Sequence, residues 1–378
     1  MTIYLIAGEK SGDFIGSRVI ESLKKYDQSL LINGIGGNLM KEMGLHSLFS
    51  IDQINMMGFF EIIPHLFHIN KLINQTVDDI IAKDSKILVT IDSPGFTYRV
   101  AKRLRKKAPD IKLIHIVAPS VWAYKPSRAK KYADLYDHML TLFPFENEYF
   151  TSAGLGTTCM GHPIFQQDFH KKSSTLRKKI GIENKSKVIA VTPGSRIAEV
   201  RRHMPIITAA LDSLSLKYHI TALFVQPDED LKKLIRKHLH NVRFSFKYTT
   251  DRLEAFALSD CALAKSGTNS FEIAASKTPL AVFYKVNWLT SLLVKMMIKI
   301  KHICLINIIS NKNIVPEFLQ DNFNVKNLYN IVDKMLSDKE YCSKQVSESE
   351  KVIESIGFNN SNLPSDIAAK TIIGLIQK

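Results

Sequence analysis

The chain has 378 residues, of which 45% are hydrophobic and 23% are charged, and its formal net charge at pH 7 is +15. This composition is globular rather than disordered, and the length favours two domains over one. The four cysteines include no Cys-x-x-Cys pair, so they indicate neither a disulfide framework nor a zinc site and fit a reducing cytoplasm. We also expect no signal peptide and no segment that spans a bilayer.

Strand-like apolar runs alternate with helix-length segments through the first part of the chain. The runs lie at residues 3–7, 30–32, 87–91, 112–117 and 139–142. Such alternation predicts a parallel sheet covered by helices on both faces. The pattern restarts after the polar, basic stretch 166–179, so we predict a first lobe of residues 1–165 and a second lobe of residues 166–354.

The second lobe repeats the alternation, with runs at residues 188–192, 220–225, 242–245, 261–264 and 280–284. We therefore predict an α/β fold made of two Rossmann-like, doubly wound lobes. Their ligands would bind in a shared cleft, at the carboxyl ends of the strands. The last segment, residues 355–378, contains a helix predicted at 364–377, and we expect it to pack back on the first lobe.

The first strand leads into a turn, Ala7-Gly8-Glu9-Lys10-Ser11-Gly12-Asp13, and then into a helix. Lys10-Ser11 resembles part of a P-loop, but Glu9 and the glycine spacing exclude nucleoside-triphosphate hydrolysis by that motif. Residues 34–37 lack the third glycine of a dinucleotide fingerprint and indicate a tight turn near a substrate.

Asp92 follows the strand at 87–91 and precedes Ser93-Pro94 and a helix. One interpretation is a helix N-cap. The other is a general base at the carboxyl end of a strand, where an acid would face the ligand.

Two small-residue turns in the second lobe follow strands and precede helices, an arrangement that binds phosphate groups. The first contains Gly194, Ser195 and Arg196, and the second comprises residues 266–268. Together they predict a nucleotide-diphosphate site, in which Glu272 could accept a hydrogen bond from a ribose hydroxyl. Ordinary strand-to-helix turns are the alternative.

Arg196 could neutralise the charge on a leaving diphosphate, or it could simply pair with Glu199 one helical turn later. Residues 228–230 have the carboxylate spacing of a metal site, but a helix follows them, which favours capping over metal binding.

Two apolar segments at residues 56–67 and 288–301, together with basic runs at 102–107 and 125–131, predict attachment to an anionic surface. Solvated helix faces are the alternative for the basic runs. Buried core helices or a homodimer surface are the alternatives for the apolar segments.

The ordered set of motifs resembles the lipid-A-disaccharide synthase family of inverting GT-B glycosyltransferases over nearly the whole chain. The segments that carry the resemblance are AGEKSGD (7–13), MGF (57–59), PHL (64–66), IDSP (91–94), PSVWAYK (119–125), FPFE (143–146), GHP (161–163), PGSRIAE (193–199) and SGT (266–268) with Glu272.

The resemblance implies transfer of diacylglucosamine from its UDP form to the 6-hydroxyl of diacylglucosamine 1-phosphate, which gives a β-1′,6 disaccharide and UDP without a metal or cofactor. It implies that the first lobe binds the acceptor and the second lobe binds the UDP-sugar. It makes Asp92 the general base and Arg196 a catalytic and UDP-binding residue. The other implied UDP-binding residues are Gly194, Ser195, Ser266, Gly267, Thr268 and Glu272, and the implied substrate-binding residues are Glu9, Ser11, Asp13 and Asn307.

A UDP-sugar epimerase on the same fold is one alternative, but it would not need the apolar segments. A basic nucleic-acid-binding protein is another, but it would leave both phosphate-type turns unused, and no recognised nucleic-acid motif appears. We therefore expect no nucleic-acid partner and a cytoplasmic enzyme held peripherally at the inner membrane.

Overall fold

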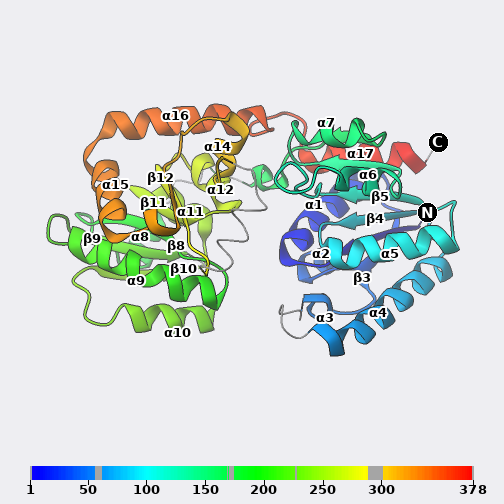
Figure 1. The fold of residues 1–378 in the computed structure, drawn as a ribbon, viewed down its shortest axis with the longest axis horizontal. Coiled ribbons are helices and arrows are strands. Elements are labelled where there is room, and N and C mark those ends of the chain that lie inside the picture. Colours follow the sequence, from blue (N-terminus) through cyan, green and yellow to red (C-terminus); the bar gives the residue numbers. More distant parts are fainter. Residues whose placement is uncertain are drawn as a thin grey trace. The chain divides into compact units, whose positions relative to one another are not determined.

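The computed structural model describes residues 2–55, 62–167, 169, 174–225, 228–287 and 301–376. The chain forms two compact units, shown as ribbons in Figure 1: Met1–Gln166 with Asn360–Lys378, and Gln167–Asn359. The return to the first unit comes at Asn360 rather than at residue 355, because helix α16 (Lys339–Ser355) still belongs to the second unit.

The first unit is built on a seven-stranded parallel sheet in the order β3-β2-β1-β4-β5-β6-β7. Its central strands are apolar runs that are buried on both faces, as parallel sheets require; all five residues of β4 are buried. The strands are β1 (Thr2–Ala7), β2 (Leu31–Ile35), β3 (His46–Ser47), β4 (Ile87–Ile91), β5 (Lys112–Ile116), β6 (His138–Thr141) and β7 (Gly156–Cys159).

Helices cover this sheet, and the last helix of the chain is one of them (Figure 1). Helix α17 packs against α1, where Ser22 donates a 2.7 Å hydrogen bond to Asp366. The helices of this unit are α1 (Lys10–Tyr26), α2 (Asn38–Glu42), α3 (Asp52–Asn55), α4 (Ile62–Ala82), α5 (Pro94–Lys107), α6 (Arg128–Ala133), α7 (Glu146–Thr151), η1 (Pro163–Gln166) and α17 (Pro364–Ile376).

The second unit contains a six-stranded parallel sheet in the order β10-β9-β8-β11-β12-β13. Its strands are β8 (Lys187–Thr192), β9 (Ile220–Val225), β10 (Ser245–Thr249), β11 (Cys261–Lys265), β12 (Leu280–Tyr284) and β13 (Glu317–Leu319). Its helices are α8 (Ser174–Lys179), α9 (Ile197–Leu214), α10 (Glu229–His238), α11 (Arg252–Leu258), α12 (Asn269–Ala275), α14 (Leu305–Ser310), η2 (Gln320–Asn322), α15 (Val325–Ser337) and α16.

The predicted strand at 242–245 is wrong in position. The strand β10 begins at Ser245 and pairs with β9 through Thr249, whereas the backbone N–H of Arg243 donates instead to the Asp212 carboxylate. The two-residue strand β3 and the polar strand β7 carry too little apolar pattern to be predicted.

Each sheet has one point at which the strand order reverses, between β1 and β4 in the first unit and between β8 and β11 in the second. Ligands of doubly wound sheets bind at the carboxyl edge beside this point, because the loops on its two sides diverge there. Among the described residues, no helix is long and apolar enough to cross a membrane.

Candidate functional site

Two turns of the first unit meet where its strand order reverses. Gly8 follows β1, and Asp92 follows the neighbouring strand β4. A Cβ atom at Gly8 would lie 2.5 Å from the Ser93 hydroxyl oxygen, so glycine is what allows these turns to touch. The structure thus brings the AGEKSGD and IDSP motifs together, although they lie far apart in the sequence.

Asp92 and Ser93 are consecutive left-handed residues, with φ angles of 48° and 49°. Non-glycine residues adopt this conformation at a cost of about 1–2 kcal/mol each, and such strain is concentrated at functional sites. The N-cap interpretation of Asp92 is wrong, because Ser93 is the N-cap residue of α5 and makes no side-chain cap bond. The Asp92 backbone carbonyl instead accepts a 2.7 Å bond from the Thr97 hydroxyl.

Asp92 is half-buried, and this burial raises the pKa of its carboxyl, while the backbone N–H of Ser93 lowers it. A carboxylate with a raised pKa binds a proton more readily, which suits a general base. The Asp92 charge also acts on Tyr132, whose pKa is raised to about 12, first by burial and to a smaller extent by that charge. Sequence analysis did not identify Tyr132, because the α6 helix that carries it has no distinctive motif.

Of the three other predicted residues in the first turn, Glu9 and Ser11 are exposed at the start of α1. Asp13 is 5% exposed and accepts hydrogen bonds from the backbone N–H groups of Gly37, Leu39 and Met40 at 2.8, 3.1 and 3.1 Å. These bonds fix the turn after β2 and the start of α2. The contacts give Asp13 a structural role, and its role in substrate binding stays a prediction.

Three further motifs of the first unit converge in one aromatic cluster. Trp122 packs edge-on against Phe145 with 5.6 Å between ring centroids, and Phe143 stacks on Phe145 at 5.7 Å. The ring of His162 lies 6.3 Å from that of Phe143. Glu146 accepts backbone bonds from Leu142 and Phe143, and burial raises its pKa to about 7.

The two predicted phosphate turns of the second unit flank the β8/β11 reversal point. Gly194 has a φ of +135°, and a Cβ atom there would lie 2.7 Å from the Glu199 Cβ atom. Both the backbone angle and the close approach therefore require glycine. The Ser195 N–H donates a 3.0 Å hydrogen bond to Glu199, which shapes the turn.

Two cations lie beside these turns. The Arg196 guanidinium is 3.7 Å from the Glu199 carboxylate, so the predicted pair forms, yet the Arg196 side chain remains 79% exposed. Lys265 approaches the same carboxylate at 3.4 Å from the end of β11. Glu199 thus holds the two turns together, and two cations share one carboxylate. Sequence analysis had not assigned Lys265 a role.

The second turn leaves open space at its glycine. The Ser266 N–H donates to the Phe283 carbonyl at 3.0 Å, and its hydroxyl donates to the Ile303 carbonyl at 2.8 Å. Gly267 faces open space, because a Cβ atom there would meet only the Lys265 carbonyl, at 4.0 Å. Thr268 is exposed as the N-cap residue of α12. The protein's own packing therefore does not require a glycine at 267.

Glu272 is fully buried one turn into α12. Its Oε1 atom pairs with Arg252 at 2.8 Å and accepts a bond from Gln167 at 3.5 Å, while its Oε2 atom is buried with no hydrogen-bond partner. Burial raises the pKa of Glu272, and Arg252 opposes that shift. An unsatisfied buried oxygen is costly, so Oε2 is a ready acceptor for a ligand hydroxyl.

Asn307 is also fully buried, but its amide is saturated. Its Nδ2 donates to Val315 and Glu317 at 2.7 Å each, and its Oδ1 accepts the N–H groups of Ile314 and Val315 at 2.9 Å each. An asparagine amide has no further capacity. The amide of Asn307 therefore has a structural role, and substrate binding by Asn307 stays a prediction.

The Asp228-Glu229-Asp230 cluster caps a helix, as the sequence favoured. The Asp228 carboxylate accepts a 2.8 Å bond from the Leu231 N–H at the start of α10. Glu229 pairs with Lys232 at 2.6 Å and Asp230 with Lys233 at 3.7 Å. These three acids are thus engaged within one helix.

The chain matches the lipid-A-disaccharide synthetase family over residues 3–371. The chain belongs to this family. The lipid-A-disaccharide synthase of Rickettsia bellii (strain OSU 85-389) is 48% identical over 373 residues, which cover 98% of each chain. That of Rickettsia prowazekii (strain Madrid E) is also 48% identical over 373 residues, with the same coverage. The family predicted from the motifs is confirmed, and the chain is a glycosyltransferase of lipid A biosynthesis with a nucleotide-sugar donor and a sugar-phosphate acceptor.

Solved structures show the same fold at low identity. A UDP-GlcNAc 2-epimerase from Neisseria meningitidis bound to UDP-GlcNAc has a TM-score of 0.66 and 13% identity, with 100% of both chains covered. A putative UDP-N-acetylglucosamine 2-epimerase from Listeria monocytogenes has a TM-score of 0.63 and 11% identity, with 100% of this chain and 95% of its own covered. These likenesses confirm the two-lobed GT-B-type α/β fold and carry no argument for the epimerase alternative.

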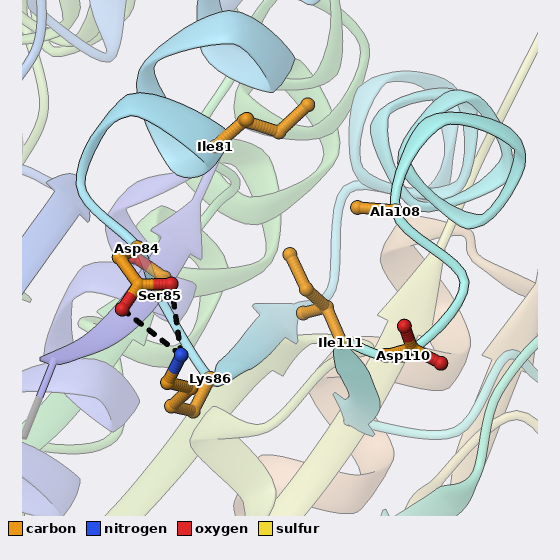
Figure 2. Close-up of a pocket in the computed structure, with 7 residues that line it drawn as sticks. All are labelled: Ile81, Asp84, Ser85, Lys86, Ala108, Asp110 and Ile111. Atoms are coloured by element: carbon orange, nitrogen blue, oxygen red, sulfur yellow. Dashed lines mark hydrogen bonds and ion pairs between the residues drawn. The ribbon is translucent and has the colours of Figure 1, made fainter.

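Two cavities lie away from the reversal points. One of about 290 Å³, shown in Figure 2, is lined by residues around the amino ends of β4 and β5, such as Ser85, Lys86 and Ile111. It is therefore at the opposite edge of the sheet from Asp92. The other, of about 260 Å³, lies at the carboxyl end of β10, and Asp251, the neighbour of Arg252, lines it.

The two apolar segments predicted to attach the protein to a surface lie largely outside the described residues. The parts that are not described are residues 56–61, with the MGF motif, and residues 288–300. Phe67, which is described, is 83% exposed. Half of the basic run 102–107 is engaged within the unit: Arg103 bonds Asn74, Arg105 pairs with Asp137 and Lys107 pairs with Asp78.

Proposed function

We propose that this member of the family transfers 2,3-diacylglucosamine from UDP to the 6-hydroxyl of 2,3-diacylglucosamine 1-phosphate, with inversion to a β-1′,6 linkage. The observation that carries this assignment is the half-buried carboxylate of Asp92, on a strained left-handed backbone at the strand-order reversal of the first unit. A single acid placed at the carboxyl edge is what an inverting transferase needs as a base. The first lobe then binds the acceptor, and the second binds the UDP-sugar.

The chemical step is a direct displacement. The acceptor 6-hydroxyl oxygen attacks C1 of the donor sugar while its proton passes to the Asp92 carboxylate. The bond between C1 and the UDP oxygen breaks, and UDP leaves with the bonding electrons. Attack from the face opposite UDP inverts the configuration at C1. The residues required are thus a base for the proton and positive groups for the departing diphosphate.

The second unit supplies those positive groups. Arg196 remains exposed while it touches Glu199, and Lys265 approaches the same carboxylate oxygen. The backbone N–H groups of Gly194, Gly267 and Thr268 add donors, and the open space at Gly267 admits a phosphate close to the backbone. The unpartnered Oε2 of Glu272 then accepts a ribose hydroxyl.

The exposed residues Glu9 and Ser11 are proposed to contact the acceptor sugar, since their turn touches that of Asp92. Both substrates are acylated, so the enzyme must draw them from a membrane. We propose peripheral attachment to the inner membrane from the cytoplasm through the apolar segments 56–67 and 288–301. A homodimer surface is the alternative role for those segments.

The function is tested by incubating the protein with UDP-diacylglucosamine and diacylglucosamine 1-phosphate and analysing the products. We expect UDP and one disaccharide 1-phosphate in equal amounts, with no added metal. Conversion of the UDP-sugar to an epimer in the absence of acceptor would instead support the epimerase. Release of UDP without a disaccharide would contradict the proposed acceptor.

A further inference from the structure

A histidine in the second unit joins two of the loops around the proposed nucleotide site. His203 lies on α9 and is fully buried. Its Nε2 atom accepts a hydrogen bond from the Lys285 N–H at 3.1 Å, so its Nδ1 atom must carry the proton and donate it to the Pro193 carbonyl at 2.6 Å. These two bonds require the neutral imidazole in a single tautomer.

The two backbone groups held by His203 belong to different parts of the site. Pro193 opens the first phosphate turn, directly before Gly194. Lys285 follows β12, and the β12 carbonyl of Phe283 accepts the N–H of Ser266 from the second turn. The imidazole therefore connects the first turn with the strand that positions the second.

The surroundings of His203 favour the neutral ring. The rings of Phe283 and Phe323 lie 5.1 and 5.6 Å from it, and burial lowers its pKa below the usual value. The charged groups that face it are Glu199, on its own helix, which opposes that shift, and Lys265, at the end of β11, which reinforces it. Tyr284, on β12, is the remaining titratable neighbour, at 6.3 Å.

We propose that neutral His203 is a positioning residue for the nucleoside diphosphate, which holds the two phosphate turns in the spacing that the diphosphate requires. The proposal rests on the proposed function, since that function places UDP at these turns. Protonation would put a second N–H against the Lys285 N–H, so that bond would be lost and the loops would separate. UDP affinity should therefore fall at acidic pH because His203 becomes protonated, in addition to any effect of the ionisation of UDP.

The test compares UDP binding by calorimetry in the wild type and three variants. His203→Leu fills the space without either bond, and we expect UDP binding about 5-fold to 30-fold weaker, as the loss of one or two hydrogen bonds implies. His203→Gln can still donate to Pro193 and accept from Lys285, so its affinity should stay near that of the wild type at pH 7.5. His219→Gln, a half-exposed histidine before β9, is the control and should change nothing.

The decisive readout is the UDP affinity of the folded His203→Leu variant at pH 7.5. A second readout is the ratio of wild-type to His203→Gln affinity, in which the ionisation of UDP itself cancels, and we expect the wild type to lose affinity relative to the Gln variant once the pH falls below the lowered pKa of His203. A folded His203→Leu protein that binds UDP like the wild type would overturn the positioning role. Failure of the wild type to bind UDP at any pH would instead reject the proposed nucleotide site.

Discussion

Replacing Asp92 by asparagine separates a chemical role from a structural one with minimal change in the protein. Asparagine has nearly the same volume as aspartate and adopts the left-handed conformation at least as readily, so the φ of 48° can be kept. No cap bond is lost, because the side chain of Asp92 does not cap α5. We therefore expect the free energy of unfolding to stay within about 0.5 kcal/mol of the wild-type value.

Turnover should respond very differently. The amide cannot accept the hydroxyl proton, and positioned acid–base catalysis is worth about 10²–10⁴-fold, so kcat should fall by that factor. Because the proposed UDP site lies in the other unit, the dissociation constant of UDP should be unchanged. Initial rates of disaccharide formation at saturating substrates, measured together with UDP calorimetry and circular dichroism, give all three quantities.

The control substitution is Asp92→Gly, which also removes the base but relieves the left-handed backbone. It should be as inactive as Asp92→Asn and at least as stable. Near-normal disaccharide synthesis by either folded variant would refute the base assignment. Asp13 would not then be the substitute base, because its carboxylate is occupied by three backbone N–H groups.

Four further outcomes are expected. Glu272→Ala should weaken UDP binding, measured by calorimetry, by roughly 10-fold to 150-fold, because one charge-assisted hydrogen bond is lost. The fold should persist, since Arg252 is one-third exposed and can turn to solvent. Gly267→Ala should leave the melting temperature unchanged yet weaken UDP roughly 10-fold, since only a ligand would meet the new methyl group. Burial raises the pKa of Glu146 from 4.5 to about 7. The protonated carboxyl therefore stabilises the fold below pH 4.5, and this contribution of about 3 kcal/mol is lost as the pH rises to about 7. In the Glu146→Gln variant, the free energy of unfolding should not show this decrease. Binding to anionic vesicles in a flotation assay should weaken with salt, because each basic residue at the surface contributes only about 1 kcal/mol and is screened; absence of binding would favour the dimer alternative for the apolar segments.

The fold was predictable because its strands are local features. Runs such as residues 87–91 and 220–225 are continuous and apolar, and the structure forms β4 and β9 with those bounds. The order of strands, and thus the position of the two reversal points, is not local. The sequence could place Gly194 and Gly267 in turns. It could not show that the close approach of Glu199 requires a glycine at 194, whereas no neighbouring group requires one at 267.

The site was predictable where a motif marks the turn and unpredictable where a distant backbone group decides the role. Asp13 lies in a recognisable motif and Asn307 was implied by the family resemblance, yet their partners lie at residues 37–40 and 314–317. Nothing in the local sequence identifies those partners. Conversely, Tyr132 and His203 lie on helices without a motif and reach the site only through the packing of their helices.

Hydrogen-bond capacity distinguishes the buried acids that support the structure from those left available for chemistry. The Asp13 carboxylate accepts hydrogen bonds from three N–H groups, and the Glu199 carboxylate accepts one from Ser195 and pairs with two cations. Within the described part of the chain, Glu272 keeps one buried oxygen without a partner, and the Ser93 N–H is the one hydrogen-bond donor that shifts the pKa of the Asp92 carboxyl. Burying a carboxylate with unused capacity costs the folded protein free energy, and a ligand that supplies the missing donor recovers it. Asp92 and Glu272 lie in different units, each beside a strand-order reversal, so their unused hydrogen-bond capacity supports the proposed base and the proposed ribose ligand in addition to the motifs.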